Sequence, residues 1–417
     1  MKLHQFKFRG KSFFFYPESL LLQTALTEDS LSQKSEMPGS GDPSCGDPAS
    51  ALLASNRIEI LVNATLECNL TCPYCFVHQG QFSYEHERPP KLSPDLARQL
   101  IHALPAAIPG ADEYCIHFYG GEPLLNPEAI GAAVEEAHAE GEKRFSFAIT
   151  TNGTIDPGSS IPLLAKGNFS VILSIDGPAH IHDAARRDTD GKATHAKVLE
   201  FLYRIKKEHS LFVRGSSVIR HGCSLKDAEQ YLEALPVDAI KAQAVRLPDG
   251  HPLALTKEER EQYFLDLEDI AAAVIEGLKD MKLPGDDRFT SRVLQLVCRS
   301  RRESFCGAGS SVFGMSCDGT IYPCVLHAGN ERLALGHISD PEHGWFLKGK
   351  EWIRTRRQRD ECKSCWAQPL CGGGCPAMLA VCGEDECEYT RKVCELALAI
   401  YGSVSHKPDL LILAGID

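Results

Sequence analysis

The chain has 417 residues, of which 43% are hydrophobic and 24% are charged, so it is long enough for two or three globular domains that each bury a core. Its formal net charge of −12 argues against nucleic acid or an anionic membrane surface as a partner. No apolar run approaches the roughly 20 residues of a membrane span, and the N-terminus lacks the apolar core of a signal peptide, so we expect a cytoplasmic protein.

The N-terminal stretch predicts a small separate element. Residues 3–16, "LHQFKFRGKSFFFY", alternate in polarity and turn at Arg9-Gly10, which predicts a hairpin. "PESLLLQTAL" then predicts a short helix, and the Ser-, Gly- and Pro-rich residues 32–50 predict a flexible linker. We therefore expect an N-terminal element over 1–31 and a linker over 32–56.

From residue 57 the chain alternates between strands and helices. The predicted strands are "RIEILVNAT", "EYCIHFYGG", "RFSFAITTNG", "SVILSIDG", "LFVRGSSVI" and "AIKAQAVRL". Helical stretches such as "SPDLARQLIHALPAAI", with Ser93 as its N-cap, separate most of them, and a long helix is predicted over 256–282. This order indicates βαβ units and a parallel α/β sheet, either an incomplete barrel or a doubly wound sheet. We expect it over 57–290, followed by a cysteine-rich domain over 291–417.

Seventeen cysteines are too many to be explained as buried apolar residues. A reducing compartment argues against disulfides, so clustered cysteines indicate metal ligands or catalytic thiols. Three lie at 68, 72 and 75, and most of the others lie between Cys298 and Cys394.

The triplet Cys68, Cys72 and Cys75 directly follows the first predicted barrel strand, at the strand edge where parallel α/β folds bind ligands. Three thiolates leave one position of a tetrahedral metal site unfilled. His78 could complete a zinc site there. Alternatively, three thiolates could hold a 4Fe–4S cluster and leave one iron open for a cofactor.

"CNLTCPYC", with Tyr74 before the last cysteine, resembles the signature of the radical S-adenosylmethionine (SAM) superfamily. The resemblance implies a partial (β/α)6 TIM-like barrel whose cluster is held by Cys68, Cys72 and Cys75. It also implies that SAM binds the open iron and is cleaved to a 5′-deoxyadenosyl radical, with Tyr74 lining the adenine.

Three further stretches resemble the family's cofactor-binding motifs. "FYGGEPLL" would place its glycines and glutamate against the methionine amino group, although alone it reads as a strand-to-helix turn. "ITTNGT" and "LSIDG" would reach the ribose hydroxyls or the carboxylate, and "HDAAR" offers an arginine for the carboxylate. On composition alone Asp176 could equally be a turn residue before Gly177. The implied cofactor-binding residues are Tyr74, Gly120, Gly121, Glu122, Asn152, Ser174, Asp176 and Arg186.

Cys306, Gly319 and Cys324 precede a C-x2-C-x5-C-x3-C run at Cys362, Cys365, Cys371 and Cys375, and Cys394 follows it. This pattern resembles the seven-cysteine SPASM extension, which implies two auxiliary 4Fe–4S clusters and three clusters in all. Two zinc ribbons are the alternative. One auxiliary cluster would take Cys362, Cys365, Cys371 and Cys394, with Cys382 or Cys387 as possible replacements for Cys394. The other would take Cys306, Cys324 and Cys375, with Cys298, Cys317 or an open position completing it.

Extra clusters suit a reaction in which a substrate radical loses an electron as a new bond forms. SPASM enzymes mostly modify peptides or proteins, and the Phe-rich N-terminal element resembles that of maturases that form thioethers. We therefore expect a thioether-forming enzyme that acts on a cysteine-containing ribosomal precursor peptide, with a flavodoxin or ferredoxin as electron donor. The N-terminal element would be part of a peptide-recognition module or a simple hairpin packed on the barrel. The sequence assigns no catalytic acid, base or hydrogen donor.

Several alternatives stay open. Other radical modifications of peptides or proteins would use the same motifs, namely carbon–carbon crosslinking, epimerisation, and formylglycine formation in a sulfatase. A zinc-binding scaffold protein would use the cysteines without redox chemistry. A pure electron carrier is a third class, but it has no use for the GGEP and ribose motifs.

Overall fold

The computed structural model describes residues 2–25, 56–77, 89–141, 144–248, 250–280, 288–355 and 359–405. The predicted linker, Cys45 and His78 therefore lie outside the described residues. The chain forms two compact units, and each is built from separate stretches of sequence. Asn56–Leu255 and Gly307–Arg356 form one, which we call the barrel unit, and the rest forms the other, which we call the C-terminal unit. In the described residues, no helix is both long and apolar enough to cross a membrane.

The barrel unit is a nine-stranded sheet in the order β12-β11-β10-β4-β5-β6-β7-β8-β9. Strands β4 to β9 pair in parallel, and β10 extends the sheet in parallel with β4, before antiparallel β11 and β12. The strands are β4 (Arg57–Thr65), β5 (Glu113–Gly120), β6 (Phe145–Thr151), β7 (Ser170–Ser174), β8 (Val213–Ile219), β9 (Ala239–Ala244), β10 (Val312–Met315), β11 (Thr320–Tyr322) and β12 (Gly336–His337). The parallel α/β sheet expected from the sequence is confirmed.

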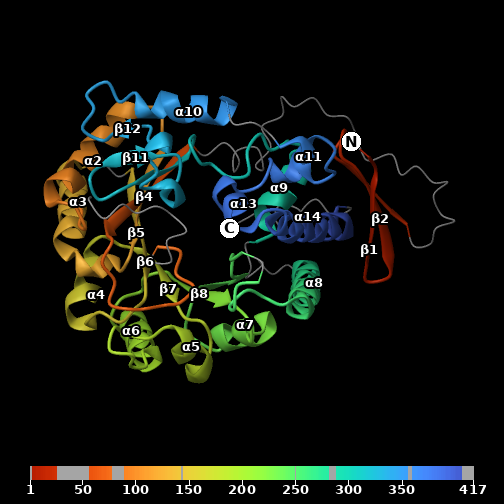
Figure 1. The fold of residues 1–417 in the computed structure, drawn as a ribbon, viewed down its shortest axis with the longest axis horizontal. Coiled ribbons are helices and arrows are strands. Elements are labelled where there is room, and N and C mark those ends of the chain that lie inside the picture. The colour runs from red at the N-terminus through yellow and green to blue at the C-terminus, as the bar shows by residue number, and fades with distance from the viewer. Residues whose placement is uncertain are drawn as a thin grey trace. The chain divides into compact units, whose positions relative to one another are not determined.

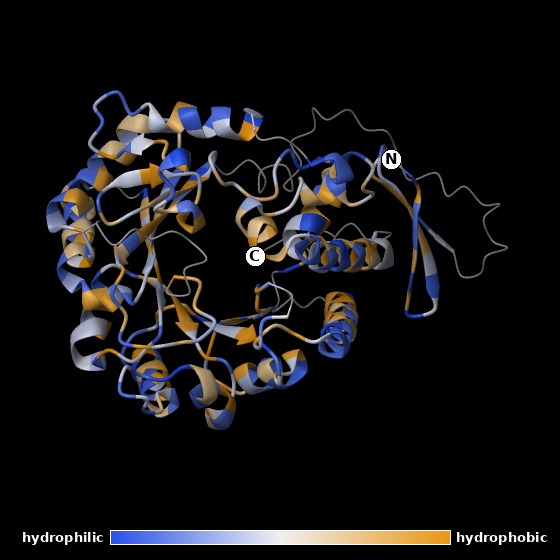
Figure 2. Cartoon of the chain, viewed as in Figure 1, coloured by the Kyte–Doolittle hydropathy of each residue, from blue (hydrophilic) through white to orange (hydrophobic). Residues whose placement is uncertain are grey.

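Helices on the outer side of this sheet form an arc around the strands (Figure 1). They are α2 (Pro94–Ala107), α3 (Pro127–Ala139), α4 (Pro157–Lys166), α5 (Ala179–Ala185), α6 (His195–Glu208) and α7 (Leu225–Glu233), and α10 (Trp345–Thr355) follows β12. Ser93 caps α2 as predicted, since its side chain accepts a hydrogen bond from the Leu96 amide at 3.2 Å. The helices carry both hydrophobic and hydrophilic residues (Figure 2), and their apolar faces share one buried core with the strands.

The strands place alternate side chains on the two faces of the sheet. On β5, Tyr114, Ile116 and Phe118 are buried in the core beneath the helices. The residues between them, among them His117, lie on the inner face. The polar inner face and the strand ends carry the first candidate site, because the loops that follow parallel strands meet at the same edge.

The C-terminal unit combines the N-terminal strands with the last helices of the chain. Its elements are β1 (His4–Phe8), β2 (Lys11–Tyr16), β3 (Leu21–Ala25), α8 (Lys257–Lys279), α9 (Thr290–Val297), α11 (Asp360–Lys363), α12 (Gln368–Cys371), α13 (Pro376–Cys382) and α14 (Asp385–Val404). Helix α14 packs on α8, α9, β2 and β3. The long predicted helix is therefore present, and a capping box between Thr256 and Glu259 starts it, but it groups with the last cysteines and not with the barrel.

The N-terminal element is a three-stranded antiparallel sheet. The predicted hairpin is confirmed, with Arg9 and Gly10 both at positive φ in the turn. The predicted helix that follows is wrong, because "LLQTA" is β3 and pairs with β2. Pairing with the buried β2 and packing on α14 outweigh the helix propensity of a short leucine-rich stretch.

Candidate functional site

The first site is the loop after β4 that carries Cys68, Cys72 and Cys75. All three cysteines are half-buried. Leu70, between the first two, is buried and forms an isolated β-bridge with Asp188. A hydrogen bond of 3.1 Å from the Cys75 amide to the Cys72 carbonyl closes a turn between the other two. The loop therefore holds its three thiols in a fixed order at the edge of the sheet.

The surroundings of Cys68 and Cys72 favour the protonated form when no metal is bound. Burial, together with Glu122 and the two neighbouring thiols, raises the pKa of Cys68 to about 11. Burial also raises the pKa of Cys72.

The paired glycines of the GGEP stretch bind this loop to the end of β5. Gly120 has φ +124°, and a Cβ on it would lie 2.2 Å from the Thr65 carbonyl oxygen. A Cβ on Gly121 would lie 2.1 Å from the Glu67 carbonyl oxygen. The amides of Gly121 and Glu122 donate to those two carbonyls, each at 2.8 Å. Only glycine permits this backbone approach.

The carboxylate of Glu122 connects the GGEP stretch to the end of β6. It is fully buried and accepts hydrogen bonds from the Leu124 amide at 3.1 Å, the Thr151 hydroxyl at 2.7 Å and the Asn152 amide at 2.8 Å. Burial raises its pKa to about 7, although the three donors oppose that shift. Glu122 thus links the GGEP stretch to the residues at the end of β6. Its contact with the methionine amino group stays a prediction.

Asn152 reaches from β6 to the cysteine loop. Its amide nitrogen donates to Asn69 at 2.9 Å and lies 3.9 Å from the Cys68 sulfur, while its oxygen accepts from the Thr154 amide at 2.9 Å. The predicted residue Ser174 is half-buried in the last position of β7. Asn69 is a residue that sequence reasoning missed, although its place directly after Cys68 could have indicated it.

Tyr74, Asp176 and Arg186, predicted from three separate motifs, form one buried group. The Tyr74 hydroxyl donates to Asp176, and the Arg186 Nε lies 3.1 Å from the Asp176 carboxylate. The Arg186 guanidinium also lies 5.5 Å from the centre of the Tyr74 ring. Burial opposes the charge on Arg186, but Asp176, Tyr74 and Cys72 outweigh it and raise the pKa of Arg186. The structure brings these residues together, and their contacts with SAM stay predictions.

His182 contacts this group through Asp176, and sequence reasoning missed it as well. Its Nδ1 accepts from the Asp176 amide at 3.4 Å, and its Nε2 lies 3.2 Å from the Thr194 hydroxyl. Burial and the nearby Arg186 charge lower its pKa to about 4, so the ring is neutral at pH 7. The histidine of "HDAAR" was the available signal, because His182 and Arg186, one turn apart on α5 and its C-cap, both contact Asp176.

A second polar group that sequence reasoning missed lies on the inner face of the sheet. His117 on β5 contacts Glu59 on β4 at 3.0 Å and Thr150 on β6 at 2.8 Å. Nearby, Tyr119 stacks on Phe76, which directly follows Cys75, with ring centres 5.8 Å apart. The alternation of polar residues along β4 and β5 was the signal for this face.

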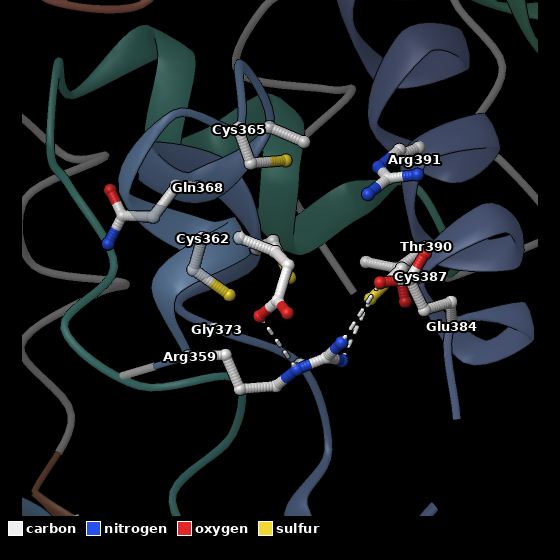
Figure 3. A pocket seen from close by; sticks show the side chains of 13 residues that line it. Arg359, Cys362, Cys365, Gln368, Gly373, Glu384, Cys387, Thr390 and Arg391 are labelled. Carbon is white, nitrogen blue, oxygen red and sulfur yellow. Dashed lines mark hydrogen bonds and ion pairs between the residues drawn. The ribbon is translucent and has the colours of Figure 1, made fainter. Parts of the chain in front are cut away.

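The second site is a pocket in the C-terminal unit, formed by α11, α12 and α14 (Figure 3). Cys362 and Cys365 form the C-x2-C pair of "CKSCWAQPLCGGGC", and Cys387 lies in the first turn of α14. The residues that line it are Arg359, Glu361, Cys362, Cys365, Ala367, Gln368, Cys371, Gly373, Gly374, Glu384, Cys387, Thr390 and Arg391. Four cysteines around one hollow fit a metal cluster.

The "CGGGC" stretch builds a sulfur-binding turn at this pocket. Gly373 and Gly374 have φ +101° and +80°, and their amides donate hydrogen bonds to the Cys371 sulfur. Burial and the neighbouring Cys394 nevertheless raise the pKa of Cys371 to about 12. Successive backbone amides aimed at one sulfur are typical of anion and iron–sulfur sites.

Cys387 and Cys394 differ in position: Cys387 lines the pocket, whereas the Cys394 sulfur interacts electrostatically with Cys365 and Cys371. Which of the two is a ligand stays a prediction. Cys394, which the sequence favours as the last ligand, is fully buried against Phe15, Leu370 and Leu398 and does not line the pocket. Its side chain bonds to Arg292. Cys382, the other alternative, ends α13 and is also absent from the pocket lining.

The predicted ligands of the remaining cluster fall into both units. Cys306 and Cys375 lie close enough in the C-terminal unit to interact electrostatically, and the amides of Ala377 and Met378 point at the Cys375 sulfur. Cys298 ends α9 in the same unit. Cys324 and Cys317 belong to the barrel unit. Cys317 is buried there, and its thiol donates to the Asn63 and Pro90 carbonyls at 3.1 and 3.6 Å. The roles of Cys298, Cys306, Cys317, Cys324 and Cys375 as ligands stay predictions.

Comparison with known proteins decides the family. Residues 62–235 match the Radical SAM superfamily. The chain belongs to the radical SAM superfamily. An uncharacterised protein of Archaeoglobus fulgidus is 30% identical over 81% of this chain and 80% of its own length. The cysteine-type anaerobic sulfatase-maturating enzyme of Clostridium novyi is 26% identical over 75% of this chain and 86% of its own.

Solved structures share the fold of this radical SAM protein. The enzyme anSMEcpe with bound AdoMet has a TM-score of 0.70 at 21% identity, covering 86% of this chain and 98% of its own. Streptococcus suis SuiB bound to precursor peptide SuiA has a TM-score of 0.51 at 14% identity, covering 90% and 95%.

Membership of the radical SAM superfamily makes the protein an enzyme that uses SAM and a 4Fe–4S cluster. The first site fits that cluster. Its three thiols are half-buried at the strand edge, on a loop that the paired glycines hold against the end of β5. When bound there, the cluster supplies the electron that cleaves SAM. Cys68, Cys72 and Cys75 would hold it, and Glu122, Asn152 and the Tyr74–Asp176–Arg186 group position the loops around it.

Proposed function

We propose that this radical SAM enzyme is of the SPASM type and oxidises a side chain of a peptide or protein by two electrons. Two cysteine sites within one chain carry the proposal. The first has the family's motif for making the substrate radical, and the second offers four thiols around a hollow that would hold an auxiliary cluster. A substrate radical that loses a further electron ends as an oxidised side chain. Two auxiliary clusters, as the sequence predicts, are part of this proposal.

The relatives favour formylglycine formation over the thioether chemistry expected from the sequence. The C. novyi relative, aligned over 86% of its length, is named a cysteine-type sulfatase-maturating enzyme, and a relative in Klebsiella aerogenes is named a serine-type one. We therefore propose oxidation of a cysteine or serine side chain as the reaction. A flavodoxin or ferredoxin would deliver the electron that starts it.

Thioether crosslinking of a precursor peptide is the second candidate. Cys306 is exposed and lies near Cys375, so a cluster held there by few protein ligands could leave one iron open to a substrate thiolate. The three-stranded N-terminal sheet would then be part of the peptide-recognition element.

The test uses anaerobically reconstituted protein with SAM and a chemical reductant. Two kinds of substrate are added, namely the Cp18Cys peptide found in an anSMEcpe structure and a cysteine-containing precursor peptide encoded beside this gene. Intact and fragment masses are recorded before and after thiol alkylation. Replacement of a cysteine sulfur by an aldehyde oxygen supports formylglycine formation.

The other outcomes are equally distinct. Loss of two hydrogen masses per bridge, with matching cysteines protected from alkylation, would establish the thioether candidate instead. Unchanged masses in both substrates, while 5′-deoxyadenosine accumulates, would contradict both candidates. Cys72→Ala is the matched control, since it keeps the pocket cysteines and removes one ligand of the radical-forming site.

A further inference from the structure

The pocket of the C-terminal unit contains two arginines whose charges face sulfur. Arg359 and Arg391 line it from opposite sides, one before α11 and the other on α14 (Figure 3). The Arg359 Nη1 lies 3.7 Å from the Cys387 sulfur. Arg391 hydrogen-bonds to the Cys365 sulfur and interacts electrostatically with Cys387. Each guanidinium therefore approaches a thiol that the pocket would offer to a cluster.

Arg359 is held in place from two sides. Its guanidinium forms ion pairs with Glu361 at 3.4 Å and with Glu384 at 3.3 Å, and these carboxylates belong to α11 and to the start of α14. The Arg359 side chain is about one-third exposed, so these ion pairs contribute little to the stability of the fold. Their main effect is geometric, because they fix the direction from which the guanidinium approaches the Cys387 sulfur.

The four lining cysteines define one ligand set. Cys362, Cys365, Cys371 and Cys387 all face the hollow, and the Gly373 and Gly374 amides already donate to Cys371. A cluster with four thiolates carries net negative charge, which increases by one on reduction. Cations and hydrogen-bond donors next to the sulfurs stabilise the reduced form most, and so they raise the reduction potential.

We propose that Arg359 and Arg391 are positioning residues that raise the reduction potential of a 4Fe–4S cluster held by Cys362, Cys365, Cys371 and Cys387, which makes this site an electron acceptor. This rests on the proposed side-chain oxidation. Cleavage of SAM consumes one electron, and the 5′-deoxyadenosyl radical takes one hydrogen atom from the substrate. The substrate radical then releases one proton and one electron as its new double bond or crosslink forms. The released electron replaces the one consumed, so no further oxidant is required.

The test is a redox titration of the full-length chain, followed by electron paramagnetic resonance. Titrations are made in a Cys68→Ala/Cys72→Ala/Cys75→Ala background, which removes the barrel cluster from the signal. We expect Arg391→Gln and Arg359→Gln each to shift the midpoint potential of the pocket cluster to more negative values. Arg391→Lys keeps the charge and should retain most of the wild-type potential. Arg204→Gln, on the exposed surface of α6, is the matched control and should shift nothing.

Iron content tests the ligand set in the same background. Cys387→Ala should lose about four irons per chain and Cys394→Ala should lose none. The reverse pattern would overturn this ligand set. An unchanged midpoint in both glutamine variants, with iron retained, would overturn the role of the arginines.

The titration needs no substrate, so it separates two kinds of failure. A shifted midpoint in a protein that oxidises neither peptide contradicts the proposed function and keeps this inference. An oxidised peptide together with an unshifted midpoint potential supports the proposed function and contradicts this inference. If Arg391→Gln fails to bind iron, Arg359→Gln and Arg391→Lys still decide the question, because Arg359 is partly exposed and lysine preserves the charge.

Discussion

The two cysteine sites differ in the charges around their sulfurs. At the barrel site, the buried carboxylates of Glu122 and Asp176 lie near the thiols, and Arg186 is paired with Asp176. At the pocket, Arg359 and Arg391 approach the sulfurs themselves. The sites therefore differ in how their cations meet sulfur: two guanidiniums approach the pocket sulfurs directly, although Glu361 and Glu384 pair with Arg359 there, whereas Arg186 at the barrel site is paired with a buried carboxylate.

This difference suits two opposite redox tasks. Negative surroundings lower the reduction potential of a cluster, and a strongly reducing cluster is what cleavage of SAM requires. Positive surroundings raise the potential, and an electron acceptor requires that. Under the proposed function, clusters at the two cysteine sites would thus serve at opposite ends of one reaction because the side chains around their sulfurs differ.

The largest expected effect is loss of the barrel cluster. Cys72→Ala should reduce 5′-deoxyadenosine formation to background, because two thiolates hold the cluster poorly and the open iron no longer binds SAM. Chromatography of the nucleoside measures this, together with iron content. Cys115→Ser changes another buried barrel cysteine and should retain activity. Full formation of 5′-deoxyadenosine by Cys72→Ala would show that the three-cysteine site is not needed for SAM cleavage, and the two sites could then not be assigned different tasks.

The next prediction breaks the buried ion pair at the barrel site. Asp176→Asn leaves Arg186 charged and buried without its partner, which should cost about 3–5 kcal/mol of unfolding free energy. Urea denaturation of the full-length chain measures the loss, and SAM affinity should weaken with it. Asp190→Asn removes an exposed partner of Lys192 and should cost no more than about 1 kcal/mol. Equal losses in the two variants would show that Asp176 is no more important than a surface charge.

The pH dependence of Glu122 is a smaller effect with a defined sign. Its folded-state pKa of about 7 lies above the ordinary value of 4.5, so the folded protein binds a proton that the unfolded chain releases between those values. Stability from this group is therefore present at low pH and is lost as the pH rises to about 7, by roughly 3 kcal/mol in all.

Glu122→Gln should remove that slope. Denaturation midpoints of the wild-type and variant proteins at several pH values between about 4.5 and 8 measure the difference. The wild-type advantage should shrink as the pH rises. A constant difference would mean that the three hydrogen-bond donors keep Glu122 ionised throughout, and that the barrel site is more negative than described above.

Much of the barrel could be predicted because its sequence signals are local. The bounds of β4 and α2 agree with the predicted stretches, since a buried strand run and an amphipathic repeat each carry their own period. The motif residues also came together as their strand order implied. Their contacts with one another were less accessible, because nothing in three separate motifs indicates that Tyr74 and Arg186 share Asp176.

Prediction failed where distant segments determine the structure. Strand β3 forms because it pairs with β2 and packs on α14. Strand β2 precedes it in the chain and α14 follows far downstream, so the local sequence does not show these contacts. The local sequence also does not show which cysteine of α14 lines the pocket, and the roles of Cys387 and Cys394 as ligands stay predictions. Both lie on α14, seven residues apart, and only the position of α11 and α12 decides which of the two faces the pocket.

The smallest predicted effect concerns how the pocket is supported. The barrel site rests on neighbouring strands, whereas the pocket region receives a strand from the other end of the chain. His4 on β1 stacks on Trp366 with ring centres 3.6 Å apart, and its Nε2 lies 2.8 Å from Glu395 on α14. Because Trp366 directly follows Cys365, this contact joins β1 to the cysteine loop.

His4→Ala removes both the stacking and the hydrogen bond, which should cost about 1–2 kcal/mol. We expect faster proteolytic cleavage within β1 and a lower unfolding midpoint, while the iron content stays near the wild-type value because no ligand is removed. Gln5→Ala, an exposed neighbour on the same strand, is the control and should change neither. Loss of iron in His4→Ala would show that β1 holds the cysteine loop in its cluster-binding form. The pocket would then depend on long-range packing in a way that the barrel site, built on consecutive strands, does not.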